Sequence, residues 1–150
     1  MNLRLRPVFQ NDWKFILKLR NQDSVRTACH DTSIIDLESH IAYMKKLEKD
    51  SDSHHWIIVC DDYDVGYIKI VKGEYGYMLK DEYMGKGLGK KHFELVFEKA
   101  ASLNIPKLTG TIRLEQSIPL KMALKAGFIK KGIIYKEEKP YAYYLEKFLN

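Results

Sequence analysis

A glycine-rich stretch near the middle of the chain has the composition of a phosphate-binding loop. It reads Met84-Gly85-Lys86-Gly87-Leu88-Gly89-Lys90, with a further lysine at position 91. Alternate glycines leave the main-chain N–H groups of a loop uncovered, and the positive end of a helix dipole attracts anions. An apolar run precedes the stretch, and apolar residues at helical spacing follow it. We therefore predict a strand, a glycine loop and a helix whose first amides hold a phosphate group.

The spacing of these glycines excludes two common phosphate-binding loops. A Walker A loop requires glycine where this chain has Met84, and Ser or Thr where it has Lys91. A dinucleotide fingerprint, Gly-x-Gly-x-x-Gly, requires glycine in place of Lys90. Two interpretations remain: a loop for a different phosphorylated ligand, and a flexible surface loop that binds nothing.

The composition is that of a folded protein with a basic C-terminal half. Of the 150 residues, 45% are hydrophobic and 30% are charged, which suits one globular core. Residues 1–75 contain 11 Lys and Arg against 12 Asp and Glu, whereas residues 76–150 contain 14 against 8. A polyphosphate ligand, nucleic acid or a solvated surface would each account for this basic excess. The chain has no helix-turn-helix, zinc-finger or RNP pattern, so we expect no nucleic-acid partner.

Other sequence features predict a cytoplasmic protein without a metal. No apolar run approaches the ~20 residues of a membrane helix, and the N-terminus lacks a signal-peptide core. Cys29 and Cys60 are too few for a disulfide framework, and no His/Cys cluster has metal-ligand spacing. We therefore expect free thiols, no membrane contact and no metal site.

The hydrophobic periodicity predicts an α+β (mixed α/β) fold around a largely antiparallel sheet. The expected strands are residues 3–8, 56–60, 65–71, 75–79, 107–113, 128–136 and 141–148. The expected helices are residues 13–20, 37–49, 88–103 and 117–126. Asp12 and Asp36 are the predicted N-caps of the first two helices, and residues 25–33 are expected to be mostly loop. The element order is β-α-α-β-β-β-α-β-α-β-β.

This order and the glycine loop resemble the GNAT acetyltransferases. The acyl-CoA loop of that family reads Arg/Gln-x-x-Gly-x-Gly/Ala. Gly87 and Gly89 fill its glycine positions, and Met84 replaces the usual Arg or Gln. The resemblance extends from Leu3 to Phe148 and implies one GNAT domain over residues 1–150.

A second motif supports the same resemblance. GNAT proteins often carry Asn-x-x-Ala/Ser-x-x-x-Tyr-x-Lys-x-Gly-Phe after the fifth strand. Gly127, Phe128 and Lys125 match the end of this motif, whereas Gln116 and Ala123 replace its Asn and Tyr. The match is therefore partial, and it removes the tyrosine that usually protonates the leaving thiolate.

The resemblance implies that the protein transfers an acetyl group from acetyl-CoA to a primary amine, by direct attack in a ternary complex. The strand that ends at Leu79 would splay from its neighbour, and the pantetheine of CoA would fill the gap. A main-chain N–H near Met78 or Leu79 would then face the thioester oxygen. The expected CoA contacts are Met78, Leu79, Met84, Gly85, Lys86, Gly87, Leu88, Gly89, Lys90 and Lys125.

Glu74 and Tyr135 are the candidates for proton transfer. Relatives carry a carboxylate where Glu74 stands, and alternation places it on the same face as Gly76 and Met78, so we predict that it is the general base. His54, His55 and Glu115 are alternative bases. Tyr135, or one of the tyrosines at 141, 143 and 144, could replace the missing acid, and a thiolate that leaves unassisted is the alternative.

The acceptor is expected to be a small-molecule amine or a peptide N-terminus. The runs 20–21 and 35–40 resemble acetyltransferases of nucleotide-linked amino sugars, as in pseudaminic acid biosynthesis, and Leu19-Arg20-Asn21 also occurs in ribosomal-protein N-terminal acetyltransferases. Arg20, Asn21 and His30 are the predicted acceptor contacts. A non-catalytic acyl-CoA sensor module is the competing interpretation. The tyrosine-rich segment 141–144 is a possible homodimer edge.

Overall fold

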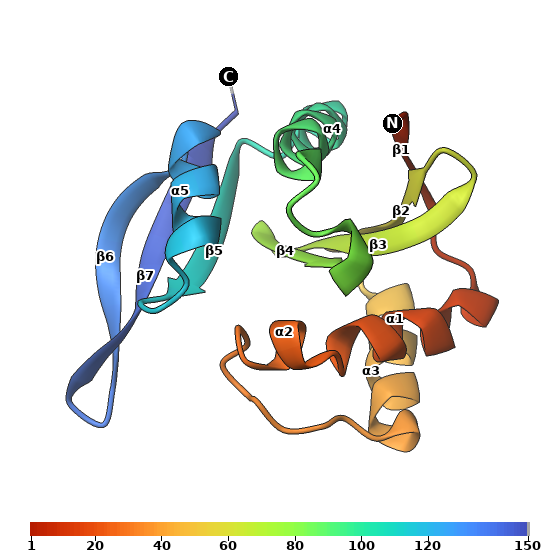
Figure 1. Ribbon diagram of the computed structural model, residues 1–150, viewed down its shortest axis with the longest axis horizontal. Coiled ribbons are helices and arrows are strands. Elements are labelled where there is room, and N and C mark those ends of the chain that lie inside the picture. The colour runs from red at the N-terminus through yellow and green to blue at the C-terminus, as the bar shows by residue number, and fades with distance from the viewer. Residues whose placement is uncertain (150) are drawn as a thin grey trace.

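Residues 1–149, which the computed structural model describes, form one seven-stranded sheet in the order β1-β2-β3-β4-β5-β7-β6 (Figure 1). The strands are β1 (Leu3–Pro7), β2 (Ser53–Cys60), β3 (Tyr63–Val71), β4 (Glu74–Leu79), β5 (Lys107–Arg113), β6 (Ile129–Lys136) and β7 (Lys139–Phe148). The helices are α1 (Trp13–Arg20), α2 (Asp23–Arg26), α3 (Leu37–Lys49), α4 (Leu88–Ser102) and α5 (Ser117–Lys125), with short 3-10 turns η1 (Gln10–Asp12) and η2 (Asp81–Tyr83). Every neighbouring strand pair is antiparallel except β4 and β5. The α+β prediction is confirmed.

Helices cover both faces of this sheet and enclose two apolar cores. On one face α4 and α5 lie over a core that includes Ile68 and Val96. On the other face α1 and α3 cover a core that includes Leu19, Met44 and Ile57. Each of these five side chains is at most 2% exposed, so both cores exclude water. No helix within residues 1–149 has the length and apolarity needed to cross a membrane.

Within the described chain, the parallel strands β4 and β5 pair at one position. Glu74 stands opposite Thr109, and the Thr109 N–H donates to the Gly73 carbonyl at 2.9 Å. Beyond this point the strands diverge, so that β1–β4 form one wing of the sheet and β5–β7 the other (Figure 1). This gap, which we call the wedge, confirms the predicted splay.

The expectation that residues 25–33 are mostly loop is confirmed; the short helix α2 covers only residues 23–26, where Val25 packs into the interior at 7% exposure. Two other expectations are wrong in detail. The segment 141–144 lies within β7, which pairs with β5 and β6 on its two sides, so it is not a sheet edge. Asp12 does not cap α1, because its carboxylate binds elsewhere. The cap at Asp36 is confirmed, since its Oδ1 accepts the Ser39 N–H at 2.7 Å.

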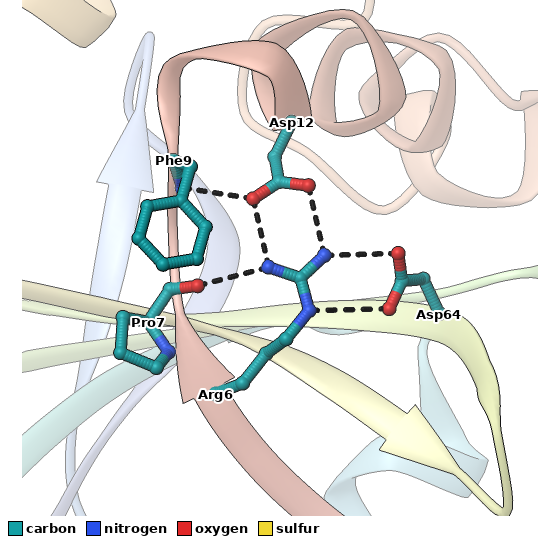
Figure 2. Close-up of polar contacts among 5 residues, drawn as sticks. All are labelled: Arg6, Pro7, Phe9, Asp12 and Asp64. Atoms are coloured by element: carbon teal, nitrogen blue, oxygen red, sulfur yellow. Dashed lines mark hydrogen bonds and ion pairs between the residues drawn. The ribbon is translucent and has the colours of Figure 1, made fainter.

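Asp12 instead binds Arg6, whose guanidinium joins β1, η1 and β3 (Figure 2). The two Nη atoms of Arg6 donate to Asp12 at 2.8 and 2.9 Å, and Nη2 and Nε donate to Asp64 at 2.9 and 3.3 Å. Nη1 also donates to the Pro7 carbonyl at 3.0 Å, and Asp12 accepts the Phe9 N–H at 2.8 Å. The Arg6 guanidinium holds the pKa of Asp12 below its usual range. This network fixes the path from β1 into α1.

We expect Arg6→Met to lower the free energy of unfolding by about 2 kcal/mol, because it leaves the buried Asp12 carboxylate without its cation. Urea unfolding at pH 7 measures this difference. The matched control is Asp64→Asn, which keeps the Arg6–Asp12 pair and removes a carboxylate that is 42% exposed; it should cost less than about 1 kcal/mol. Equal losses of unfolding free energy in both variants would contradict the conclusion that the Arg6–Asp12 pair provides most of this stabilisation.

A buried histidine joins β4 to α4. His92 is 1% exposed, its Nε2 is hydrogen-bonded to the Tyr75 hydroxyl, and its ring stacks on Tyr77 with 3.9 Å between centroids. Burial lowers the pKa of His92 from 6.5 to about 4. The folded protein therefore resists protonation of a group that the unfolded chain protonates readily.

The stability that depends on neutral His92 should be complete above pH 6.5 and should disappear as the pH falls toward 4. In that window the unfolded chain binds a proton that the folded protein does not, which amounts to about 3 kcal/mol. Urea unfolding at pH 7 and pH 4.5 measures the loss. The double variant Tyr75→Phe/His92→Phe leaves no unpaired partner and should lose less stability over this interval. The same loss in both proteins would show that other groups cause it.

Candidate active site

The glycine loop enters α4 through two residues in the left-handed region. Gly85 has φ = 72° and Gly87 has φ = 76°, and no atom lies within 4 Å of a Cβ built at either position. The requirement for glycine is therefore conformational, since a residue with a Cβ is strained at these angles. Gly87 is the N-cap of α4, and the backbone turns there so that the helix begins at Leu88.

The first turn of α4 has N–H groups that could bind an anion. The N–H groups of Leu88, Gly89 and Lys90 belong to the first turn, which has no acceptors within the helix. Gly87 provides no capping side chain, and the first turn contains no acidic residue. The exposed lysines 86 and 90 flank these amides, whereas the Lys91 ammonium donates to the Met1 carbonyl at 2.9 Å. The geometry is that of a preformed phosphate site.

Helix α5 packs closely against this site. A Cβ on the buried Gly89 would lie 1.8 Å from the Met122 methyl carbon, so the missing side chain lets the two helices approach. Lys125 is exposed on the same short helix. Ala123, at the motif position usually held by tyrosine, is 5% exposed and points into the core.

The main chain of β4 directs one N–H group into the wedge near its end. The Lys80 N–H donates to the Val65 carbonyl of β3 at 2.8 Å. Because N–H groups alternate between the two edges of a strand, the Met78 N–H faces β3 and the Leu79 N–H faces the wedge. Of the two N–H groups predicted to donate to the thioester oxygen, only that of Leu79 points into the wedge.

Gln22, which the sequence analysis did not single out, binds the end of β4. Its Nε2 donates to the Leu79 carbonyl at 2.9 Å, and its Oε1 accepts the Asp81 N–H at 3.0 Å. The turn between α1 and α2 is thereby attached to the strand at the wedge. Because Gln22 binds main-chain atoms 57 and 59 residues away, no pattern in the sequence around it indicates this role.

Arg20 and Asn21 hold the loop between α2 and α3. The Arg20 guanidinium donates to the Asp31 carbonyl at 2.7 Å. The Asn21 side chain donates to the Ile35 carbonyl and accepts the Ile35 N–H, both at 2.9 Å. These bonds give Asn21 a positioning role, and its contact with the acceptor stays a prediction.

The same loop crosses to the other wing of the sheet at His30. The His30 Nε2 lies 2.8 Å from the Thr111 hydroxyl of β5, and the Tyr141 hydroxyl donates to the His30 carbonyl at 3.1 Å. Arg113 donates to the carbonyls of Thr27 and Cys29 at 3.0 and 3.2 Å. Residues 27–35 therefore bridge the two wings beside the wedge, and the contact of His30 with the acceptor stays a prediction.

The two predicted catalytic residues are far apart in the sheet. Glu74 is exposed at the first position of β4, opposite Thr109 where the wedge begins. Tyr135 is 63% exposed on the edge strand β6, and both β5 and β7 separate it from the wedge. Of the alternative bases, His55 binds the Tyr67 hydroxyl at 2.8 Å and Glu115 pairs with Arg113 at 2.7 Å. Glu74 is thus the predicted base that lies at the wedge.

Known structures with this arrangement share its fold at low sequence identity. Spermidine N-acetyltransferase from Vibrio cholerae, in complex with CoA and spermine, aligns with a TM-score of 0.86 at 14% identity over 98% of this chain and 95% of its own. A domain from Methanocaldococcus jannaschii aligns with a TM-score of 0.83 at 17% identity over 99% of both chains. A structure described as a phosphinothricin N-acetyltransferase gives the same values. No curated protein sequence matches significantly.

Membership of a family follows from the sequence itself. The model of the GNAT acetyltransferase domain matches residues 2–129, which is most of the chain. The matched region contains β1 through the glycine loop, the wedge and α5. The protein belongs to the GNAT family and is an acetyl-CoA-dependent N-acetyltransferase.

Proposed function

We propose that this enzyme acetylates the primary amine of a small molecule, with acetyl-CoA bound in the wedge and the acceptor entering beneath residues 27–35. The divergence of β4 and β5 beside the first turn of α4, which has no capping side chain, is the observation that carries the proposal. Pyrophosphate would bind the N–H groups of residues 84–90, with Lys125 nearby. The Leu79 N–H would donate to the thioester oxygen, where negative charge develops.

Glu74 is the proposed general base, acting directly or through a water molecule. It lies at the narrow end of the wedge, and strand alternation puts it on the face of Met78, opposite the face covered by α4. An amine that enters from the α1 and α3 side would meet this carboxylate before it reaches the thioester. Removal of its proton makes the nitrogen nucleophilic.

The acceptor belongs to the class of small amines. The similar structures named above are a spermidine and a phosphinothricin N-acetyltransferase, so a polyamine and an amino acid analogue head the candidates. Nucleotide-linked amino sugars and peptide N-termini complete the set, with His30 and Arg20 as the proposed contacts. We propose a cytoplasmic location, in keeping with Cys29 and Cys60, which are free thiols.

Gly87→Val should weaken acetyl-CoA binding at least 10-fold, because a β-branched residue cannot hold φ = 76° without strain and the amides that follow would turn away. Calorimetric titration of acetyl-CoA measures the affinity. Gly132→Val is the matched control: it lies on exposed β6, has open space around its Cβ position and should bind like the wild type. Unchanged affinity in Gly87→Val would refute the phosphate site.

Glu74→Gln should reduce kcat about 100-fold while acetyl-CoA affinity stays within about 3-fold, because the amide keeps the shape but cannot accept the proton. Thiol release with spermidine, phosphinothricin, a nucleotide-linked amino sugar and an N-terminal peptide measures turnover. Glu115→Gln, which removes a carboxylate paired with Arg113, is the control and should retain activity. A fully active Glu74→Gln enzyme would exclude Glu74 as the base.

A further inference from the structure

We propose that the Tyr77 hydroxyl donates a hydrogen bond to the CoA sulfur as the thiolate departs, the task left open by Ala123. The inference rests on the proposed function, since it requires the thioester in the wedge. Tyr77 belongs to β4, the strand that lines one side of this gap. It would act from the opposite face of β4 to Glu74.

The side chain of Tyr77 lies on the α4 and α5 face of the sheet. It packs against the core cluster that contains Ala123, and its ring stacks on His92 of α4 at an interplanar angle of 13°. The tyrosine that the family motif usually carries at position 123 would stand on this face of the sheet. Tyr77 therefore approaches from the same face as the tyrosine that the motif lacks, but from the strand instead of the helix.

The other nine tyrosines either have hydrogen-bonded hydroxyls or lie away from the side of the wedge that β4 lines. The hydroxyls of five of the ten form hydrogen bonds, namely Tyr43, Tyr67, Tyr75, Tyr141 and Tyr144. Tyr63 and Tyr135 are 69% and 63% exposed, Tyr83 lies in η2 beyond β4, and Tyr143 is on β7, with β5 between it and the wedge. Within residues 1–149 the Tyr77 hydroxyl has no hydrogen-bond partner, so it is available to a ligand.

The environment of Tyr77 suits a donor that keeps its proton. Burial raises the pKa of Tyr77 to about 12, so the phenol is protonated at neutral pH. Its stacking partner His92 stays uncharged, because burial lowers the pKa of His92 to about 4. Stacking on a buried ring also limits the orientations of the phenol. A pre-oriented neutral donor stabilises a thiolate without giving up its proton.

The proposed step is balanced without another reactant. The amine lone pair forms the N–C bond, the C–S bond breaks, and sulfur keeps the electron pair. Tyr77 donates its hydrogen bond to that sulfur throughout. The proton released from nitrogen passes through Glu74 to solvent, and the free thiolate takes a proton from solvent. The products are the acetylated amine and CoA.

Tyr77→Phe should lower kcat about 10- to 100-fold, as expected for the loss of a hydrogen bond to a charged group. The KM for acetyl-CoA should change less than about 3-fold, because the ring and its stack on His92 remain. Thiol release is followed with the best amine of the panel or, where no amine reacts, by hydrolysis of acetyl-CoA. Tyr63→Phe, at a tyrosine of β3 that is 69% exposed, is the matched control and should retain wild-type activity.

A second measurement separates this role from a structural one. The ultraviolet absorbance of the thiolate reports the pKa of the CoA thiol while CoA is bound. A hydrogen bond to the thiolate lowers that pKa, so it should be higher by about one unit in the Tyr77→Phe complex. Desulfo-CoA, which has no sulfur, should bind both proteins equally.

The outcomes distinguish this inference from the proposed function. Wild-type protein that does not bind acetyl-CoA would overturn both. Wild-type turnover with an equally active Tyr77→Phe enzyme, or an unchanged thiol pKa, would overturn the Tyr77 role alone and show that the thiolate leaves without this bond. If Tyr135→Phe loses activity while Tyr77→Phe stays fully active, Tyr135 and not Tyr77 is the partner of the CoA sulfur.

Discussion

Strand β4 pairs with β3 over its whole length but meets β5 at one position, and the active site depends on that mismatch. Beyond Glu74 the N–H and C=O groups on one edge of β4 have no strand beside them. An unpaired strand edge binds another extended chain readily. Pantetheine is such a chain and carries amide groups, so in the proposed complex the cofactor replaces the missing strand.

Polar contacts attach the helical region around α1 and α2 to both wings of the sheet beside the wedge. Gln22 binds the end of β4, while His30 and Arg113 attach the loop of residues 27–35 to the other wing. The His92–Tyr75 bond joins β4 to α4, the helix whose first turn forms the proposed phosphate site.

Local features of the sequence were read correctly where the neighbouring chain decides the structure. The glycine loop, the α4 helix and the Asp36 cap depend on residues within a few positions of one another. Asp12 was misread because it has the sequence context of a cap, whereas the Arg6 guanidinium offers a stronger, charged partner from another strand. Tyr135 was chosen by residue type, and strand order then placed it on the far edge.

By itself the sequence determined the element order, the phosphate loop and the family, because periodicity and glycine conformation are properties of short segments. Only the tertiary structure decided which groups face the wedge. The register of β4 against β3 distinguishes the Leu79 N–H from that of Met78. Tyr77 differs from the other tyrosines by its place on β4, its face, and a hydroxyl without a hydrogen-bond partner within residues 1–149. Strand register and face depend on contacts between residues far apart in the chain, and residue type alone does not encode them.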